Sequence, residues 1–201
     1  MIVDSGKPAV FINAHYPQLN FPYVETNDTD AEKTLVDYLL DHGHERVLGV
    51  FQVDDLQGVH RMNGFIKSYQ THPNVSTSGD IMMYRSSDDI HDVLDKIKTR
   101  VQVEMNALPT AIVCYNDQLA IEVIGMLSKE GIQVPDQISV AGFDDYQISQ
   151  YIDPTLTTMD HPKRKMGHTA AQLLLDMLDG KDGSSKILDS DLIVRASTKS
   201  I

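Results

Sequence analysis

The sequence predicts an α/β fold made of doubly wound parallel sheets, and three observations lead to this prediction. Short apolar runs alternate with amphipathic helical segments along nearly the whole chain. The apolar runs are almost continuous, as in strands that are covered on both faces of a parallel sheet. The chain has 201 residues, of which 41% are hydrophobic and 23% charged, which is enough for one large or two small domains.

The beginning of the chain predicts two strands and a helix. Apolar runs over 9–13 and 21–27 indicate a short buried strand and a second, partly exposed one. Thr29 and Glu32 have the spacing of a capping box, in which both side chains bind backbone N–H groups, so a helix is expected to begin there. Gly43 ends this helix, because glycine readily adopts the left-handed conformation that follows a helix C-terminus.

The rest of the chain continues the alternation. Strands are predicted over 46–53, 80–84, 110–115, 138–143 and near 192–197. Apolar residues three and four positions apart predict helices within 59–69, 90–101, 119–127 and 166–177. The Gly-, Ser- and Asp-rich segment 179–186 is expected to be a linker or an exposed loop.

The charge and the composition exclude several classes of protein. The formal net charge is −12, so the chain by itself is a poor binder of nucleic acid, which requires Lys and Arg to neutralise phosphates. A single cysteine, Cys114, cannot form an internal disulfide, which favours a reducing cytoplasmic location. No signal peptide is visible at the N-terminus, and no apolar run approaches the roughly 18 residues of a membrane span, so no membrane partner is expected.

Three of the predicted strands end in adjacent polar residues. Asn and Asp often cap the helix that follows, and for any single pair this is the favoured interpretation. In parallel α/β sheets, however, ligands lie at the carboxyl ends of the strands, so three such ends predict a polar rim around a site. The three pairs are Asp54-Asp55, Asn116-Asp117 and Asp144-Asp145.

Motifs of the common enzyme and metal sites are absent from the sequence. Neither a GxxxxGK[ST] loop nor a GxGxxG turn is present for a nucleotide phosphate, and no GxSxG or HExxH motif occurs. His42 and His44 flank the glycine at a helix end, where a solvated C-cap is the simpler interpretation than a metal site. The chain is therefore expected to be no enzyme, and to need neither a metal nor a cofactor.

The rim has the chemistry of a sugar-binding site. Arg61 lies one turn into the helix that follows Asp54-Asp55 and can point back to the rim, although alone it is equally well a surface arginine. Together, Arg61, Asn116 and Asp144 offer a donor fork, an amide and an acceptor carboxylate, which suit sugar hydroxyls because each hydroxyl both donates and accepts. Tyr84, Tyr115 and Phe143 can supply flat apolar faces, although each is individually more typical of core.

A series of motifs then resembles the effector domains of LacI/GalR-type regulators. These motifs are "RVLGVF", "GVHRMNGF", "PTAIVCYNDQLAI", "ISVAGFDD", "PTLTTMDHP", "MGHTAAQLLLDML" and "LIVRAS", in the family's order, and the resemblance extends from "KPAVFIN" to the end of the chain. It implies two α/β subdomains of the periplasmic-binding-protein-like type I, joined by three crossovers, with a small sugar in the cleft between them. L-arabinose is the first sugar to be expected. DNA would be bound only through a separate domain that precedes this one in such regulators.

The resemblance also implies boundaries and site residues. The N-terminal subdomain would comprise 1–43 and 157–183, without the family's first strand–helix–strand, and the C-terminal subdomain 44–156 and 184–201. Matching positions suggest that Arg61, Asn116 and Asp144 bind the sugar directly. The residues that match lining positions are Gln57, Tyr84, Phe143 and His161, with Asn27 or Asp28 from the other subdomain.

A homodimer is expected, because effector domains of this family usually pair about a two-fold axis. Two other functions stay open at this point. An extracytoplasmic sugar-binding protein for transport would have the same two-lobed shape, and a sugar-converting enzyme would show turnover.

Overall fold

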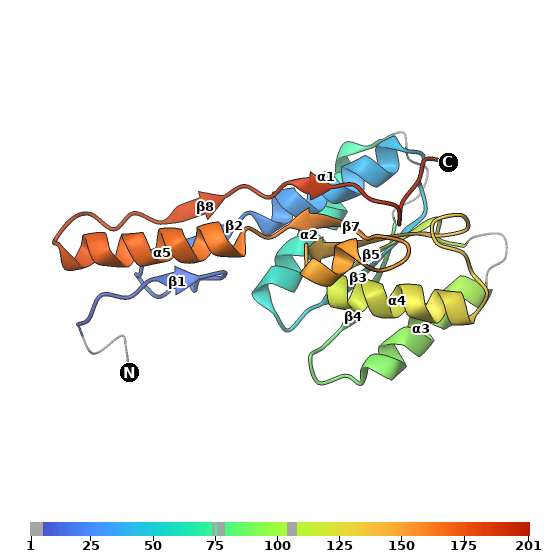
Figure 1. The fold of residues 1–201 in the computed structure, drawn as a ribbon, viewed down its shortest axis with the longest axis horizontal. Helices are drawn as coiled ribbons and strands as arrows, with labels where there is room; N and C mark the ends of the chain where they lie inside the picture. The colour runs from blue at the N-terminus through green and yellow to red at the C-terminus, as the bar shows by residue number, and fades with distance from the viewer. Residues whose placement is uncertain (1–5, 74, 76–78, 104–107) are drawn as a thin grey trace. The chain divides into compact units, whose positions relative to one another are not determined.

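The computed structural model describes residues 6–73, 75, 79–103 and 108–201. The chain divides into two compact units, which Figure 1 shows as a ribbon. Unit 1 comprises Met1–Asn27 and His161–Ser190, and unit 2 comprises Asp28–Asp160 and Asp191–Ile201. The chain therefore passes between the units three times, as the resemblance implied.

Unit 2 is built on a six-stranded sheet with the order β4-β3-β5-β6-β7-β9. All neighbouring strands are parallel except β9, which runs antiparallel to β7 at one edge. The strands are β3 (Val47–Gln52), β4 (Asp80–Tyr84), β5 (Ala111–Cys114), β6 (Ser139–Asp144), β7 (Thr157–Asp160) and β9 (Leu192–Ile193).

Helices cover both faces of this sheet. On one face, α3 (Ile90–Val103) and α4 (Asp117–Lys129) form a core with strand residues such as Leu48 and Val50. On the other face, α1 (Asp28–Asp41) and α2 (Leu56–Thr71) pack on the alternate strand residues, such as Val47 and Phe51. Figure 1 shows the two helix pairs on either side of the strands. Apolar side chains on both faces explain why the strands read as continuous apolar runs.

Unit 1 is smaller. Its sheet has the order β1-β2-β8, all parallel, from β1 (Phe11–Ile12), β2 (Tyr23–Thr26) and β8 (Lys186–Leu188). Helix α5 (Lys163–Leu178) packs on it through Met166, Ala170 and Leu173, which share a core with Val24 and Leu188. Residues three and four apart on α5 thus form the buried stripe that the sequence predicted.

Two strands of the structure were not predicted. β7 lies in a segment where no strand was predicted. Its two threonines are buried because side chains of other segments bind them: Thr157 Oγ1 lies 2.8 Å from Thr198 Oγ1, and Thr158 Oγ1 donates a hydrogen bond to Asp117. β8 lies at the end of the segment expected to be a linker, where it pairs with β2. Both strands depend on partners that are distant in the sequence.

The predicted capping box at the start of α1 is wrong. The helix begins at Asp28, so Thr29 lies inside its first turn and donates a hydrogen bond to the backbone oxygen of His60 at 3.1 Å. The Glu32 side chain does not return to the backbone but lies fully buried, and neither of its oxygens has a hydrogen-bond partner among the described residues. Gly43 does have the predicted left-handed conformation, with φ at +95°.

The division into units differs from the boundaries expected at 43/44, 156/157 and 183/184. Helix α1 belongs to unit 2, because it packs along α2 and shares its core, and β7 belongs there because it pairs with β6. Among the described residues, no helix combines the length and the apolar character that crossing a membrane requires.

Candidate functional site

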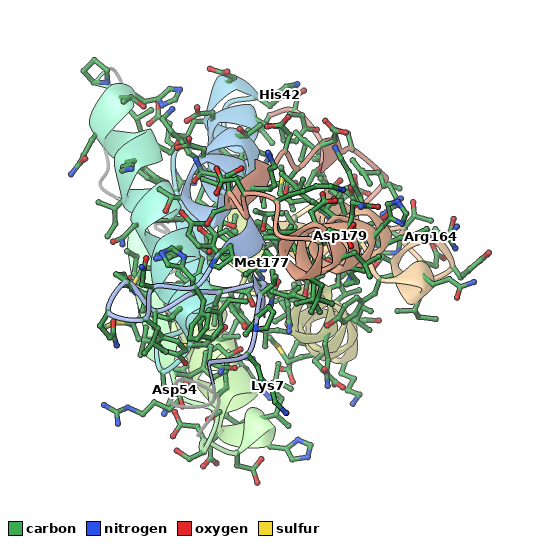
Figure 2. All side chains as sticks on the ribbon, turned by 90° about the vertical axis from the view of Figure 1, so that its left-hand side faces the viewer. Lys7, His42, Asp54, Arg164, Met177 and Asp179 are labelled. Atoms are coloured by element: carbon green, nitrogen blue, oxygen red, sulfur yellow. The ribbon has the colours of Figure 1, made fainter. Side chains whose placement is uncertain are left out.

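The predicted polar rim corresponds to one edge of the unit 2 sheet. Strands β3, β5 and β6 are neighbours and run parallel, so the residues at or just after their carboxyl ends, Asp54, Asn116 and Asp144, lie at the same edge. Figure 2 shows Asp54 at the end of unit 2 opposite His42, which follows α1. The edge is the position where open α/β sheets bind ligands.

Arg61 is the centre of this edge. It lies on α2, directly after the end of β3, and is only 1% exposed. Its Nε donates to Asp28 Oδ1 at 3.0 Å, its Nη1 to the backbone oxygen of Tyr115 at 2.6 Å, and its Nη2 to Asp144 Oδ1 at 3.2 Å. The arginine therefore connects the start of α1 with the ends of β5 and β6.

Two aromatic rings complete the surroundings of the guanidinium. The centroid of the Phe143 ring lies 3.6 Å from Arg61 Cζ, and that of the Tyr115 ring 5.1 Å. Such stacking stabilises a cation that has been removed from water. Burial by itself lowers the pKa of Arg61, but the carboxylates of Asp28 and Asp144 outweigh this and raise it. The guanidinium is therefore a fixed positive charge.

Asp144 and Asp145 have different partners. Asp144, 8% exposed, faces Arg61, whereas Asp145 Oδ1 accepts a hydrogen bond from Arg195 Nη2 at 2.7 Å. Both aspartates have positive φ, 106° and 42°, which is uncommon for a residue other than glycine. Backbone strain of this kind persists where the surroundings impose it, and it is frequent at functional sites.

Asn116 has the role of a helix cap. Its side-chain oxygen accepts a hydrogen bond from the backbone N–H of Leu119 at 2.9 Å, at the first turn of α4. For the Asn116-Asp117 pair, the interpretation that the first residue caps the following helix is thus confirmed.

Asp117, the second residue of the rim pair Asn116-Asp117, has a structural role. It is fully buried and accepts hydrogen bonds from Thr158 Oγ1 and Ser149 Oγ, both at 2.6 Å, and from the Tyr146 N–H at 2.8 Å. Burial raises the pKa of Asp117, and these hydrogen bonds oppose the rise. The side chain joins α4 to β7 and to the loop that follows β6.

The Asp54-Asp55 pair does not contact Arg61. Asp54 is exposed, and its carboxylate accepts hydrogen bonds from Ser86 Oγ at 2.6 Å and from the Ser86 N–H at 3.0 Å, which lower its pKa. Asp55 accepts a hydrogen bond from the Tyr115 hydroxyl instead of capping α2. This bond fixes the Tyr115 ring beside Arg61.

The other predicted site residues divide between the two units. Gln57 is buried one helical turn before Arg61 on α2, and the Tyr84 ring meets the Tyr115 ring edge-on, with centroids 6.5 Å apart. Asp28, expected in the other subdomain, belongs to unit 2 and pairs directly with Arg61. Asn27, which is exposed, and His161, which is 9% exposed, belong to unit 1.

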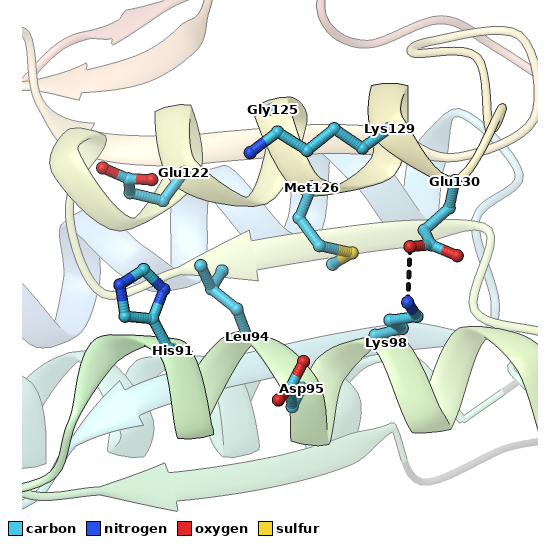
Figure 3. A pocket seen from close by; sticks show the side chains of 9 residues that line it. All are labelled: His91, Leu94, Asp95, Lys98, Glu122, Gly125, Met126, Lys129 and Glu130. Carbon is cyan, nitrogen blue, oxygen red and sulfur yellow. Dashed lines mark hydrogen bonds and ion pairs between the residues drawn. The ribbon is translucent and has the colours of Figure 1, made fainter.

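Elsewhere on unit 2, an open groove lies between α3 and α4 (Figure 3). Its walls carry charges of both signs, and Lys98 Nζ pairs with Glu130 Oε1 at 2.5 Å across it. The charged side chains do not converge on one point, so the groove lacks the features of a specific site. Across the described ranges, no group of His, Cys, Asp and Glu residues is arranged to hold a metal ion.

Comparison with known sequences identifies a family and several relatives. A family described as a periplasmic binding protein-like domain matches residues 36–198. The chain is 38% identical over 198 residues to an arabinose metabolism transcriptional repressor of Geobacillus stearothermophilus, with 96% of this chain and 54% of that protein covered. It is 28% identical to the HTH-type transcriptional repressor CytR of Escherichia coli strain K12, over 96% of this chain and 57% of that protein. The chain thus spans about half the length of these curated relatives.

Solved structures share the fold over nearly the whole chain. A LacI family transcriptional regulator from Enterococcus faecium, with bound ribose, has a TM-score of 0.85 at 23% identity, covering 98% of this chain and 73% of that one. A LacI transcriptional regulator from a Rhodococcus species has a TM-score of 0.84 at 26% identity, covering 96% and 70%. The likeness extends to both units.

Proposed function

Because the chain belongs to the periplasmic binding protein-like domain family, and has its type I fold, we propose that it is the sugar-sensing effector domain of a transcriptional repressor. The relatives named above are transcriptional regulators and not enzymes. Regulation by a small molecule requires a site for it, and the Arg61 cluster is the part of the chain with that chemistry.

The single observation that carries the proposal is the pairing of Arg61 with Asp144 at the carboxyl edge of the sheet. The pair offers donors and an acceptor side by side, which is what neighbouring sugar hydroxyls require. Phe143 and Tyr115 hold the guanidinium in place, so little ordering remains to be done when a ligand binds. Gln57, Tyr84 and Asn116 from the same edge complete the unit 2 part of the proposed site, and Asn27 and His161 are proposed as its residues from unit 1.

The proposal extends to the effector, the DNA-binding domain, the location and the oligomeric state of the whole protein. We take L-arabinose as the effector, because the relative that is 38% identical is named for arabinose metabolism. DNA would be bound by a separate domain. The motifs "VDDLQGVHRMNGF" and "CYND" resemble those of the bacterial arabinose repressor, and this resemblance implies a GntR-type winged helix. The repressor would act in the cytoplasm as a homodimer, with two-fold symmetry.

Calorimetric titration with L-arabinose, D-xylose and D-galactose tests the site. Asp144→Asn keeps the shape of the side chain but removes its charge, and Arg61→Lys keeps the charge but removes the planar fork. Each leaves a polar partner poorly paired, which costs about 1–3 kcal/mol, or roughly a tenfold to hundredfold loss of affinity. Of the three sugars, L-arabinose should bind most tightly to the unaltered chain.

The control is Asp145→Asn, one residue further along, whose partner is Arg195 and not Arg61. This variant should keep the sugar affinity within about twofold, a change of less than about 0.5 kcal/mol. Circular dichroism melting checks that all variants fold. Unchanged affinity in both Asp144→Asn and Arg61→Lys would reject the site, and no binding of any sugar by the unaltered chain would reject the function.

A further inference from the structure

A buried carboxyl group without a partner lies beside the Arg61 cluster. Glu32 is 0% exposed, and neither of its carboxyl oxygens has a hydrogen-bond partner among the described residues. A buried polar group in this condition is costly, since it has given up its hydrogen bonds to water. The proposed sugar site does not use it, so its presence requires a separate explanation.

The helices bring Glu32 to this position by two local features. Glu32 lies four residues after Asp28 on α1, so both side chains are on the same face of the helix, and Asp28 binds Arg61 Nε from there. Gly64 lies three residues after Arg61 on α2, and a Cβ atom at this glycine would stand 2.8 Å from Glu32 Cβ. The two helices therefore approach each other closely at Glu32, within one turn of Arg61 on α2.

The charged and titratable groups around Glu32 come from each element packed against it. They are Asp28 on its own helix, Arg61 on α2 and Cys114 on β5, and Arg61 is itself paired with Asp144 at the end of β6. Burial raises the pKa of Glu32 to about 8; the charge of Arg61 opposes this rise, and that of Asp28 adds to it. At neutral pH the carboxyl is therefore mostly protonated and uncharged.

Arg61 has N–H groups that its hydrogen bonds with the described residues do not use. A guanidinium has five N–H groups, and in Arg61 three of them donate to Asp28, Tyr115 and Asp144. The other two meet no acceptor in the described part of the chain. An ionised Glu32 would be a buried anion without a hydrogen-bond partner among the described residues, and its charge would attract the Arg61 guanidinium because the surroundings screen charge poorly.

We propose that Glu32, in its neutral form, is a positioning residue that leaves two N–H groups of Arg61 available to the sugar, and that ionisation of Glu32 withdraws them. This inference rests on the proposed function of the Arg61 site. It makes ligand binding dependent on pH in the mildly alkaline range. The group that senses pH would be one helical turn from a residue of the site and would not itself contact the ligand.

The test is the sugar affinity of the 201-residue chain between pH 6.5 and 9, measured by calorimetry with L-arabinose. If binding requires neutral Glu32, the affinity should fall about tenfold between pH 7 and 9, because one group with a pKa of about 8 ionises over this range. Glu32→Gln, which is permanently neutral, should keep the affinity constant within about twofold, or about 0.4 kcal/mol. Glu122→Gln is the matched control, an exposed glutamate of α4 that should leave the fall with pH unchanged.

A spectroscopic signature accompanies this measurement. With 13C-labelled glutamate carboxyl groups, one resonance of the ligand-free chain should titrate near pH 8 and be absent from Glu32→Gln. If Glu32→Gln does not fold, Glu32→Leu replaces it, since leucine of similar size removes the acid without adding a polar group.

The possible results separate the two proposals. No sugar binding at pH 6.5 would overturn both the function and the inference that rests on it. Binding whose fall with pH is the same in Glu32→Gln and in the unaltered chain would overturn the inference alone. A fall that disappears in Glu32→Gln but persists in Glu122→Gln supports it.

Discussion

Buried polar side chains are stable where hydrogen bonds and opposite charges replace the lost contacts with water, and two residues of this protein differ in this respect. Arg61 is almost fully buried, yet two carboxylates, a backbone oxygen and two aromatic faces compensate for the lost water. Glu32 is equally buried and has no such compensation, so burial raises its pKa to about 8 and favours its uncharged form. Arg61 thus keeps its positive charge, whereas burial disfavours the negative charge of Glu32 in the same cluster.

The raised pKa of Glu32 predicts how the stability of the fold depends on pH. The folded chain holds this proton up to about pH 8, whereas the unfolded chain loses it near 4.5. Between these values the unfolded state binds fewer protons, so the free energy of unfolding falls as pH rises from 4.5 to 8, and the contribution is constant outside this window.

Glu32→Gln should therefore gain stability relative to the unaltered chain as pH rises through this window, by at most about 1.4 kcal/mol per pH unit. Urea unfolding at pH 5, 6, 7 and 8 measures the difference. Glu122→Gln, altered at an exposed site, should show a difference that does not change with pH. A constant difference for Glu32→Gln as well would contradict the assignment of a buried, neutral acid.

At the scale of elements, the site depends on how closely α2 approaches its neighbours. A Cβ atom on Gly58, in the first turn of α2, would stand 1.8 Å from the backbone oxygen of Gln52, so only glycine allows α2 to follow β3 so tightly. At Gly64, a Cβ atom would stand 2.3 Å from the backbone oxygen of Thr29. Arg61 lies between these two glycines and is fixed by both contacts.

Gly64→Ala should lower the free energy of unfolding by about 1–3 kcal/mol, because the added methyl group forces α1 away from α2. The same shift should weaken sugar binding, since α1 carries Asp28, the partner of Arg61 Nε. Gly125→Ala is the control: this glycine is inside α4 with open space at its Cβ, so alanine should gain about 0.5–1 kcal/mol. Chemical denaturation of both variants measures the two effects, and equal stability changes of the same sign would refute the argument from the close contact.

At the scale of the whole molecule, the sign of the charge decides which partners the chain can bind by itself. With 29 acidic against 17 basic residues, its net charge is −12. A surface of this kind repels phosphates, and several of the cations are already paired, as Arg195 is with Asp145 and Lys98 with Glu130. Control of DNA by this chain would therefore be indirect.

The isolated 201-residue chain should show no sequence-specific binding to operator DNA at physiological salt, because specific binding draws much of its affinity from neutralised phosphates. Fluorescence anisotropy with a labelled duplex measures this, with and without L-arabinose. A specific, salt-sensitive rise in anisotropy with the isolated chain would contradict the assignment of DNA binding to a separate domain.

The sequence by itself determined the α/β class, the order of most strands and helices, and the polar ends of β3, β5 and β6. These features are local, since a strand or helix buries its apolar residues at a fixed period and a parallel sheet brings like strand ends to one edge. The same reasoning singled out Arg61 and Asp144, and the structure shows them paired.

Only the tertiary structure decided which polar side chains form hydrogen bonds and ion pairs with one another. β7 was missed because its threonines are buried against Thr198 and Asp117, residues that no local pattern connects with it. Thr29 and Glu32 matched a capping box, but packing against α2 placed Glu32 in the core instead. The pairing of Asp28 with Arg61 and the raised pKa of Glu32 follow from contacts between helices that lie apart in the sequence, because burial and charge act through space and not along the chain.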